Sequence, residues 1–499
     1  MGTCSEDIFM LSYICKVTAV LMKPRIITTI LMLAAFMGVC AGGQVSPGVF
    51  FQGGDNWAGR IDYFNREAGK AHPLIGYTVT WAYEFGVSWP DYITETVKAG
   101  SIPLMTWVSC VNDIMDSNYP LQKIIDGAFD DYIRRSARTL KNCNTRILCR
   151  FDQEMNLNIW AWSVTAPWNN GDPKQYVEMW RHVVGIFKEE GVTNVEWIWC
   201  PNCMSYTLEA WNDVENYYPG DDYVDWIGID GYSWGSANTS GNSQSALSFP
   251  CIFDPIIRDL QCAHKKPIIL CETGCLEDAR YPKAKWIGDA YDYLFEYPFI
   301  KGIVWLNSYN PDTGTGEDFR VIRMYDDKLG VPGIVTSAYR SALAPESLIA
   351  YLPTLEQVTP AELSCSPLPR GGEYPKHEMM LNKHPGLIYR TGDVLAPAYF
   401  VYPAADPANM FVDPYVVVRL PNNTYYSYTQ SGFVRGIAPA ATGFAVKRES
   451  RSMTFYHTFS NDLPEGAYTL YSALVRSGQS PTVAANQLSF DEDPFVYQR

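Results

Sequence analysis

Short apolar runs alternate with longer helix-like segments along the chain between about residues 45 and 345. The runs are rich in β-branched and aromatic residues, as buried strands are, and the segments between them show helical period. Such alternation predicts βα units around a parallel sheet, and eight units are the number that closes a barrel. The runs cover residues 48–53, 74–81, 102–110, 146–151, 195–199, 224–232, 267–272 and 300–307. We therefore predict an α/β fold, a (β/α)8 TIM barrel over residues 44–345.

Two of the intervening segments carry a clear helical signal. Apolar side chains recur at helical spacing from Tyr176 to Phe187, and Gly191 follows as a stop signal. A second helix is predicted through Ile133 and Leu140. Both segments lie where a βα alternation requires a helix.

The character of the sequence changes after residue 345. Prolines recur from Pro353 to Pro375, which predicts a linker over residues 346–385. Beyond it, strand-like runs at residues 414–420, 453–459 and 467–475 are joined by turn residues. We predict a small C-terminal all-β, sandwich-like domain over residues 386–499. Its aromatic residues could bind sugar, but we interpret it as a structural or anchoring module.

Residues 1–43 have the order of a secretory signal. A basic segment beginning at Met22 precedes an apolar run from Ile26 to Val39 and then the small residues after Cys40. The run is short for a membrane span, so we expect a cleaved signal peptide and no integral membrane span in the mature chain. Cys40 matches a lipid-attachment motif poorly, which disfavours a lipid anchor. We predict an N-terminal extension and signal, and a secreted protein.

Charge and cysteine content exclude some classes of partner. The chain has 39 Lys and Arg against 54 Asp and Glu, a net charge of -15, and no basic run, so we expect no nucleic-acid partner. The pairs Cys200/Cys203 and Cys271/Cys275 lack further ligands at metal-site spacing, and we interpret them as thiols or disulfides. No metal and no cofactor is predicted.

Two carboxylates stand where a barrel carries its active site, at the C-terminal ends of strands. Glu154 follows the fourth predicted strand and Glu272 closes the seventh. Hydrolysis of an acetal needs an acid for the leaving oxygen and a second carboxylate for the cationic carbon. Strands four and seven face each other across an eight-stranded barrel, so the two groups could flank one sugar ring.

Four segments resemble family 26 glycoside hydrolases, the group containing β-mannanases and mixed-linkage β-glucanases. They are Trp180–Val183, Tyr217–Tyr232, Lys266–Ile269 and Asp318–Arg320, and the resemblance covers residues 48–345. It implies that Glu154 is the general acid/base and Glu272 the nucleophile of a retaining mechanism. It also implies that Tyr232 hydrogen-bonds the nucleophile, that Trp305 is a platform under the reacting sugar, and that Arg320 contacts a neighbouring subsite from a loop.

Further residues near the predicted strand ends complete the candidate site. We expect a polysaccharide to contact Gln153, Trp160, Trp162, Trp107, Trp199, Asn202 and Trp234, whereas Trp197 is interpreted as core. Gln153 departs from the resemblance, because the family usually has His there. The histidine that mannan-type enzymes tend to carry after strand three is also absent, so β-mannan and mixed-linkage glucan stay equally open.

The function predicted from the sequence is a secreted, retaining endo-β-glycanase. Its substrate is β-mannan or mixed-linkage β-1,3-1,4-glucan, and no cofactor takes part. The alternative is a non-catalytic or weakly catalytic carbohydrate-binding protein on the same barrel, motivated by the altered surroundings of Glu154.

Overall fold

The fold is taken from a computed structural model of the chain. By its internal contacts the chain divides into residues 1–42 and residues 43–499. The described residues are 44–52, 56–81, 89–111, 115–207, 209–235, 246–310, 317–363, 376–382, 388–402, 411–442, 444–445, 450–453, 455–482 and 487–499. The predicted signal peptide lies outside them. No helix in these ranges has the length and apolar character needed to cross a membrane.

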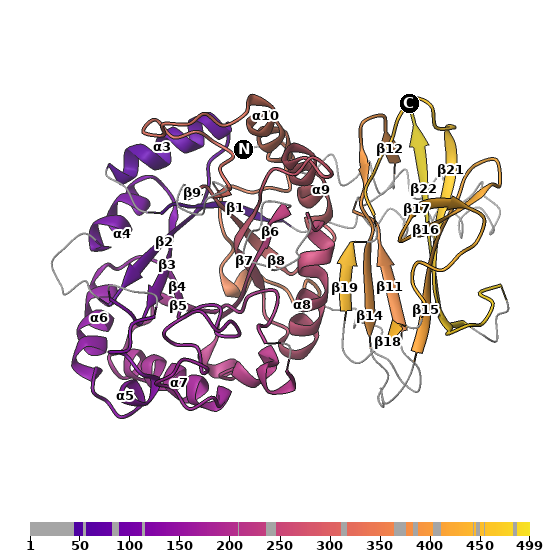
Figure 1. Ribbon diagram of the computed structural model, residues 1–499. Helices are drawn as coiled ribbons and strands as arrows, with labels where there is room; N and C mark the ends of the chain where they lie inside the picture. Colours follow the sequence, from indigo (N-terminus) through magenta and orange to yellow (C-terminus); the bar gives the residue numbers. More distant parts are fainter. Residues whose placement is uncertain are drawn as a thin grey trace, which may run out of the picture. The chain divides into compact units, whose positions relative to one another are not determined.

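Eight parallel strands close a barrel in the order of the sequence, which confirms the predicted fold class (Figure 1). The strands are β1 (Ser46–Phe50), β2 (Leu74–Thr80), β3 (Ile102–Val108), β4 (Ile147–Phe151), β5 (Val195–Trp199), β6 (Trp226–Ser233), β7 (Ile268–Cys275) and β8 (Ile300–Leu306). Each predicted run overlaps its strand, although β1, β6 and β7 each extend beyond one end of the predicted range. The seventh strand continues three residues past Glu272, where the sequence predicted its end.

Helices surround the barrel (Figure 1). They are α3 (Trp57–Ala68), α4 (Trp89–Lys98), α5 (Leu121–Ile125), α6 (Asp130–Asn142), α7 (Pro173–Glu189), α8 (Phe249–His264), α9 (Lys283–Leu294) and α10 (Gly333–Ala342). Short 3-10 turns lie at Ala210–Asn212, Val214–Tyr217, Asp221–Tyr223 and Leu355–Gln357. The two helices predicted from periodicity are α7 and α6. The Asp172 side chain caps α7 by accepting from the Lys174 N–H, and Pro173 opens its first turn.

Alternate residues of each barrel strand enter two different apolar clusters. One cluster draws side chains from all eight strands and none from α3–α10, so it is the barrel interior; its members include Phe50, Leu74, Leu104, Leu148, Ile198, Trp226, Ile269 and Val304. The other cluster joins the remaining strand positions to the helices. Because strand side chains alternate between faces, the first cluster shows which positions point into the barrel.

A hairpin, β9 (Tyr309–Asn310) with β10 (Glu317–Asp318), follows the last barrel strand. After α10 the chain stays in contact with the barrel. Leu348 pairs with Val45, Arg146 donates to the Leu352 carbonyl oxygen at 2.9 Å, and Gln261 donates to that of Leu363 at 2.8 Å. The first part of the predicted linker is therefore packed on the barrel.

The C-terminal region is all-β, as predicted (Figure 1). Its strands are β11 (Lys376–Met380), β12 (Ile388–Arg390), β13 (Val394–Leu395), β14 (Ala398–Tyr402), β15 (Phe411–Arg419), β16 (Tyr425–Thr429), β17 (Gly432–Arg435), β18 (Phe444–Ala445), β19 (Ser450–Met453), β20 (His457–Thr458), β21 (Gly466–Arg476) and β22 (Gln487–Gln498). A three-stranded sheet has the order β11-β14-β19, and a seven-stranded sheet runs β12-β22-β21-β15-β16-β17, with β18 paired to β15. Side chains of both sheets meet in one core.

Asn382 links the two folds through a buried network. Its Nδ2 donates to Asp289 Oδ2 on α9 at 2.6 Å and to the Val394 carbonyl at 2.8 Å. Its Oδ1 accepts from Tyr389 Oη at 3.1 Å and from the Ala396 N–H at 2.7 Å. A buried amide with these partners is fully satisfied, which favours a fixed junction.

Candidate active site

Arg150 is the charged centre of the barrel interior. It lies on β4 two residues after the inward-pointing Leu148, and its side chain is fully buried. Nη1 donates to both oxygens of Asp230, each at 2.7 Å, and Nε donates to Thr106 Oγ1 at 2.9 Å. Nη2 donates to Glu272 Oε1. One guanidinium therefore ties together β3, β4, β6 and β7.

Glu272 reaches the interior because β7 is irregular. Ile229 of β6 pairs with Leu270, but the next residue, Asp230, pairs with Glu272, so Cys271 is an extra residue. Strand side chains normally alternate between the two faces of the sheet. Such a bulge shifts this alternation by one residue, so the side chain after it points to the other face. Glu272 consequently faces Arg150, and its side chain keeps 18% of its surface exposed. A substrate can reach it.

Tyr232 holds the second oxygen of Glu272. Its phenol, on β6, donates to Glu272 Oε2. Burial, and then the charge of Glu272, raise the pKa of Tyr232 well above its ordinary value, so the phenol keeps its proton and acts as a donor. Arginine and phenol together fix the orientation of the Glu272 carboxylate.

Glu154 lies in a tight loop after β4. Asp152 and Glu154 adopt positive φ values of 39° and 55°, a region that side-chain-bearing residues seldom occupy. The Glu154 N–H donates to the Cys200 carbonyl at 2.7 Å, and the Asp152 N–H donates to that of Trp107 at 3.1 Å. Such strain costs on the order of 1–3 kcal/mol per residue and persists where the surroundings enforce it.

Two donors orient the Glu154 carboxyl group. Asn202 Nδ2 donates to Oε1 at 2.7 Å, and Trp160 Nε1 donates to Oε2 at 3.1 Å. Asn156 in turn holds Asn202, since its Oδ1 accepts from the Asn202 N–H at 2.9 Å. The Glu-Met-Asn sequence thus carries both the carboxyl group and the residue that fixes its partner.

The environment of Glu154 favours its protonated form. Burial is the main cause and the nearby charge of Glu272 the second, and together they raise the pKa of Glu154 from 4.5 to about 7. The donors from Asn202 and Trp160 act in the opposite direction. Glu154 can therefore carry a proton near neutral pH, as a general acid must.

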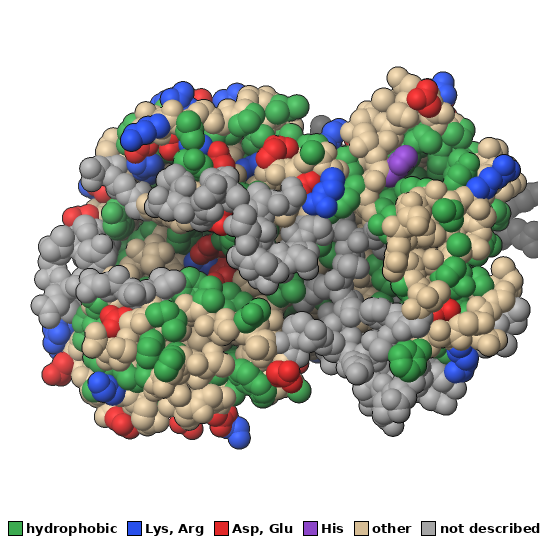
Figure 2. Space-filling view, in the orientation of Figure 1, with side chains coloured by type: hydrophobic (Ala, Val, Ile, Leu, Met, Phe, Trp, Pro, Cys, Tyr) green, Lys and Arg blue, Asp and Glu red, His purple; other side chains and the backbone are tan. Residues whose placement is uncertain are grey.

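Aromatic rings border the two carboxyl groups. Trp160 stacks on Trp162, with centroids 5.2 Å apart, and Trp162 Nε1 donates to the Gln153 carbonyl at 2.7 Å. Tyr232 contacts Trp234, with centroids 5.5 Å apart. Gln153 Oε1 is buried and has no hydrogen-bond partner within the described part of the chain. Figure 2 shows a hollow in the barrel domain, with acidic and basic side chains at its bottom.

Three predicted contact residues lie elsewhere. Trp107, Trp199 and Trp305 sit next to inward-pointing residues on their strands, so they face the helical layer, and they are at most 2% exposed. Trp305, for example, contacts Trp286 of α9 and donates Nε1 to the Phe319 carbonyl at 2.7 Å. These positions correct the prediction that they touch the sugar. Trp197 also faces outward, as interpreted from the sequence.

Arg320 is buried in an ion-pair network. Its guanidinium pairs with Asp318 at 2.7 Å and with Asp327 at 3.0 Å, and it lies over the Tyr309 ring at 4.8 Å. These contacts fix the loop after β8, which brings Phe319 against Tyr232 at 5.1 Å. The direct contact of Arg320 with a subsite stays a prediction.

Arg150 and Asp230 were missed by the sequence reasoning, although a signal for both exists. Each is a charged residue inside an otherwise apolar strand, and fully buried charges are rare unless they are paired. Two such residues of opposite charge on strands of one barrel predict an internal ion pair.

The cysteines that the structure describes belong to no candidate metal site. In the described ranges no group of three or more His, Cys, Asp or Glu residues is arranged to hold a metal ion. Cys262 is disulfide-bonded, whereas Cys200, Cys271 and Cys275 are free thiols.

The fold and the site together define a class. A TIM barrel that holds one carboxylate between an arginine and a phenol, and raises the pKa of a nearby second carboxyl group to about 7, has the machinery of a glycoside hydrolase.

Comparisons with known proteins agree with this class. The family model "Glycosyl hydrolase family 26" matches residues 90–249, a span that contains Glu154 and Tyr232. Endoglucanase H of Acetivibrio thermocellus is 28% identical over 297 residues, which cover 57% of this chain and 31% of that protein. Beta-1,3-xylanase TXYA of a Vibrio species is 30% identical over 126 residues, covering 24% of this chain and 27% of that protein.

Among solved structures, the modular endo-beta-1,4-mannanase of Cellulomonas fimi covers 91% of this chain and 94% of its own, at 13% identity and a TM-score of 0.44. The chain spans about a third or less of the length of the curated relatives named above. Residues 90–249 are thus similar to glycosyl hydrolase family 26, and the similarity to endoglucanase H extends over 57% of the chain.

The raised pKa of Glu154 predicts the pH profile. Because the general acid must be protonated, kcat/KM should fall as the pH rises through about 7. Removing the Asn202 donor by Asn202→Ala removes a contact that lowers this pKa, so the alkaline limb should move to higher pH. Asn158→Ala, at an exposed position of the same segment, is the matched control. If the alkaline limb of the pH profile did not move in Asn202→Ala, the result would contradict the role of Glu154 as the general acid.

Arg150→Lys tests the positioning of Glu272. A lysine can reach Asp230, but it lacks the forked guanidinium that contacts Asp230 and Glu272 at the same time. We therefore expect kcat to fall roughly 100-fold, which is the effect of losing one preorganised hydrogen-bond donor. KM should change much less, because the substrate itself does not touch Arg150. Arg146→Lys, which changes the Arg146–Glu196 pair at the start of the same strand, should keep kcat within about twofold. Thermal unfolding of both variants separates misfolding from misplacement, and a folded Arg150→Lys enzyme with normal kcat would refute the role.

Proposed function

We propose that the protein is a secreted, retaining endo-β-glycanase that hydrolyses β-mannan or mixed-linkage β-1,3-1,4-glucan by double displacement. The observation that carries the proposal is the asymmetry of the two carboxyl groups. Glu272 accepts from a buried guanidinium and a phenol, whereas burial raises the pKa of Glu154 to about 7. One group is suited to attack, and the other is suited to carry a proton.

In the first step Glu272 attacks the anomeric carbon and forms a glycosyl ester. The bond to the leaving oxygen breaks, and Glu154 gives that oxygen its proton. In the second step the Glu154 carboxylate takes a proton from water, and the water oxygen displaces Glu272. Two inversions at one carbon give net retention, and both residues return to their starting states.

The substrate class rests on the relatives' names and on the shape of the site. One relative is an endoglucanase and another a β-1,3-xylanase, so β-linked glycans are the shared chemistry. Trp160 and Trp234 supply ring faces near the carboxyl groups, and apolar sugar faces stack on such rings. Trp162 is only 1% exposed and supports Trp160 by stacking on it. Reducing-sugar release from β-mannan, mixed-linkage glucan and β-1,3-xylan tests the choice among them.

The alternative, a carbohydrate-binding protein without strong catalysis, is favoured by one observation. Gln153 stands where the resemblance calls for histidine, and its side-chain oxygen is buried without a partner in the described part of the chain. A buried unsatisfied amide is a natural acceptor for a sugar hydroxyl, which suits binding as well as hydrolysis. The two hypotheses differ in turnover, because only a hydrolase needs both glutamates.

Glu154→Ala separates the roles of the two carboxyl groups. The variant should cleave polysaccharide far more slowly but still be glycosylated by an aryl glycoside with a good leaving group, because that group needs no proton. Glycosyl-enzyme should then accumulate and give a burst. Azide, which attacks without base help, should restore turnover and yield the β-glycosyl azide.

Glu178→Ala, an exposed glutamate on α7, is the control and should behave as the parent. Glu272→Ala should form no glycosyl-enzyme with either substrate. Equal loss on both substrates without azide rescue in Glu154→Ala would remove it from the acid/base role and would favour the binding protein.

Secretion is proposed from the signal-like order of residues 22–43. The parent gene expressed in a secreting host should deliver protein to the medium with a new N-terminus just after this segment. N-terminal sequencing measures it, and protein retained in the cells with residues 22–43 intact would overturn the proposal.

A further inference from the structure

The seven-stranded sheet has an outer face with its own side-chain set. Val416 and Val418 of β15 point into the sandwich core, so Tyr415, Val417 and Arg419 point to the opposite face. By register, Tyr471 lies beside Val417, and Tyr425 lies beside Arg419. Tyr415 belongs to a small apolar cluster that is separate from the core.

This outer face is not the one that meets the barrel. The three-stranded sheet supplies β14 and β19, which pack against α8. The seven-stranded sheet turns its inner face to that sheet across the shared core. Its outer face is therefore left for another contact.

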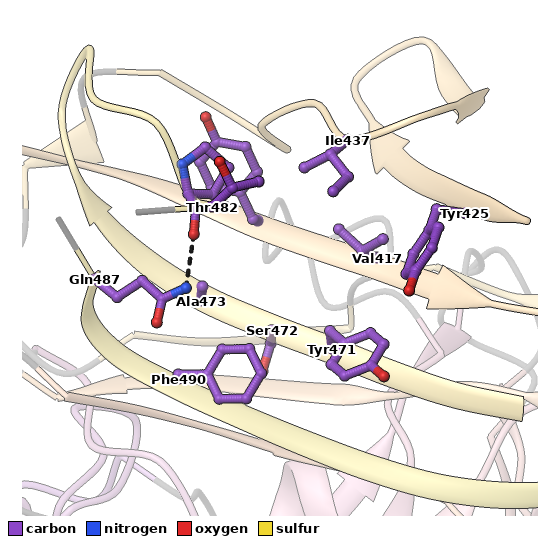
Figure 3. Close-up of a pocket in the computed structure, with 11 residues that line it drawn as sticks. Val417, Tyr425, Ile437, Tyr471, Ser472, Ala473, Thr482, Gln487 and Phe490 are labelled. Atoms are coloured by element: carbon purple, nitrogen blue, oxygen red, sulfur yellow. Dashed lines mark hydrogen bonds between the residues drawn. The ribbon is translucent and has the colours of Figure 1, made fainter. Parts of the chain in front are cut away.

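A groove of about 180 Å³ lies on this face, and Figure 3 shows the side chains along it. It is lined by Tyr415, Val417, Tyr425, Ile437, Tyr471, Ser472, Ala473, Pro481, Thr482, Gln487 and Phe490. We name these residues the sheet-face groove. Strands β15, β16, β21 and β22 contribute to it, so its floor is a rigid sheet.

Exposed aromatic rings dominate the groove. Tyr425 is 38% exposed and Phe490 is 50% exposed, which is unusual for rings of this size. Tyr471 lies next to Phe490, with centroids 6.0 Å apart at 34°. Arg419 lies over the Tyr471 ring at 5.9 Å and donates to Thr469 Oγ1 at 2.9 Å, which steadies that ring. The rings form a pre-arranged platform.

The polar groups of the groove are all neutral. Tyr425, Tyr471 and Thr482 supply hydroxyl groups, and the Gln487 side chain is held in place by its bond to the Pro481 carbonyl at 2.6 Å (Figure 3). No Asp, Glu, Lys, Arg or His is among the lining residues. Charged side chains only border the lining, with Arg419 over the Tyr471 ring and Glu492 beside Tyr471 in the β21–β22 register. A purely apolar ligand would leave the hydroxyl groups unpaired. The lining suits a neutral ligand with apolar ring faces and hydroxyl edges.

We propose that the sheet-face groove is an ancillary binding site for a β-linked polysaccharide, distinct from the barrel site. The choice of polymer rests on the proposed function of the barrel, because a second site for the same chain would hold the enzyme on its substrate. Linking two sites in this way raises the effective concentration of substrate at the first without any new catalytic contact.

The test uses the full-length enzyme and insoluble β-mannan, with insoluble mixed-linkage glucan as a second arm. The double variant Tyr425→Ala/Tyr471→Ala should partition onto the polymer roughly tenfold less, because it removes two central stacking rings. Its rate on a soluble oligosaccharide should stay within about twofold, since the barrel is untouched. Tyr471→Phe keeps the ring and should retain most of the binding.

Phe411→Ala is the matched control. Phe411 is a 53% exposed ring that also lies on β15 but does not line the groove, so its loss should leave partitioning unchanged. Equal partitioning of the double variant and the parent would overturn the proposal, and so would an equal loss in Phe411→Ala. A changed sedimentation coefficient with unchanged binding would make the groove an interface between copies and would also overturn it.

The two proposals fail in different ways. If the parent enzyme hydrolyses soluble oligosaccharide and the double variant still binds the polymer normally, only the proposal of a binding site in the sheet-face groove is refuted. If the parent enzyme binds the polymer through the groove residues but hydrolyses nothing, only the proposed catalytic function is refuted.

Discussion

The buried guanidinium of Arg150 is the interaction on which the active site depends. It is 0% exposed and meets Asp230, which is 1% exposed, inside the barrel. A buried charge that loses its partner costs about 3–5 kcal/mol, so each side chain holds the other in place inside the barrel. The same guanidinium donates to Glu272, and the proposed nucleophile is therefore positioned by a side chain that the ion pair with Asp230 holds in place.

The second carboxyl group is controlled by different means. Glu154 sits on strained backbone that is pinned by the Cys200 carbonyl, and its oxygens face donors from Asn202 and Trp160. Burial is the main cause of its raised pKa, and the charge of Arg150 acts in the opposite direction. The two glutamates thus have different surroundings: donors from Arg150 and Tyr232 orient Glu272, whereas burial raises the pKa of Glu154, which suits a division of labour between nucleophile and acid.

The barrel could be predicted from the sequence because strand and helix periods repeat eight times, and each repeat supports the same fold. The glutamates were found because strand ends are where barrels carry chemistry. Three tryptophans were misplaced because strand ends were treated as active-site positions without following the alternation. In β8, inward-pointing Val304 and Leu306 force Trp305 outward. The bulge at Cys271, which turns Glu272 inward, has no sequence signal of its own, because it depends on pairing with β6.

The C-terminal sandwich extends the account from chemistry to substrate attachment. One of its sheets packs against α8, and the other sheet carries the rings of the sheet-face groove on its outer face. In the proposed scheme, the barrel breaks the bond and the sheet face keeps the polymer near.

The central claim is that Glu154 and Glu272 act as a retaining pair. Proton NMR of the first turnover products distinguishes this directly, because the anomeric signals of a new reducing end resolve before mutarotation. Cleavage of a β-linked oligosaccharide should release the β-anomer first, with the α-anomer growing in only at the spontaneous rate. Initial release of the α-anomer would mean a single displacement by water, and would contradict the account of Glu272 as a nucleophile.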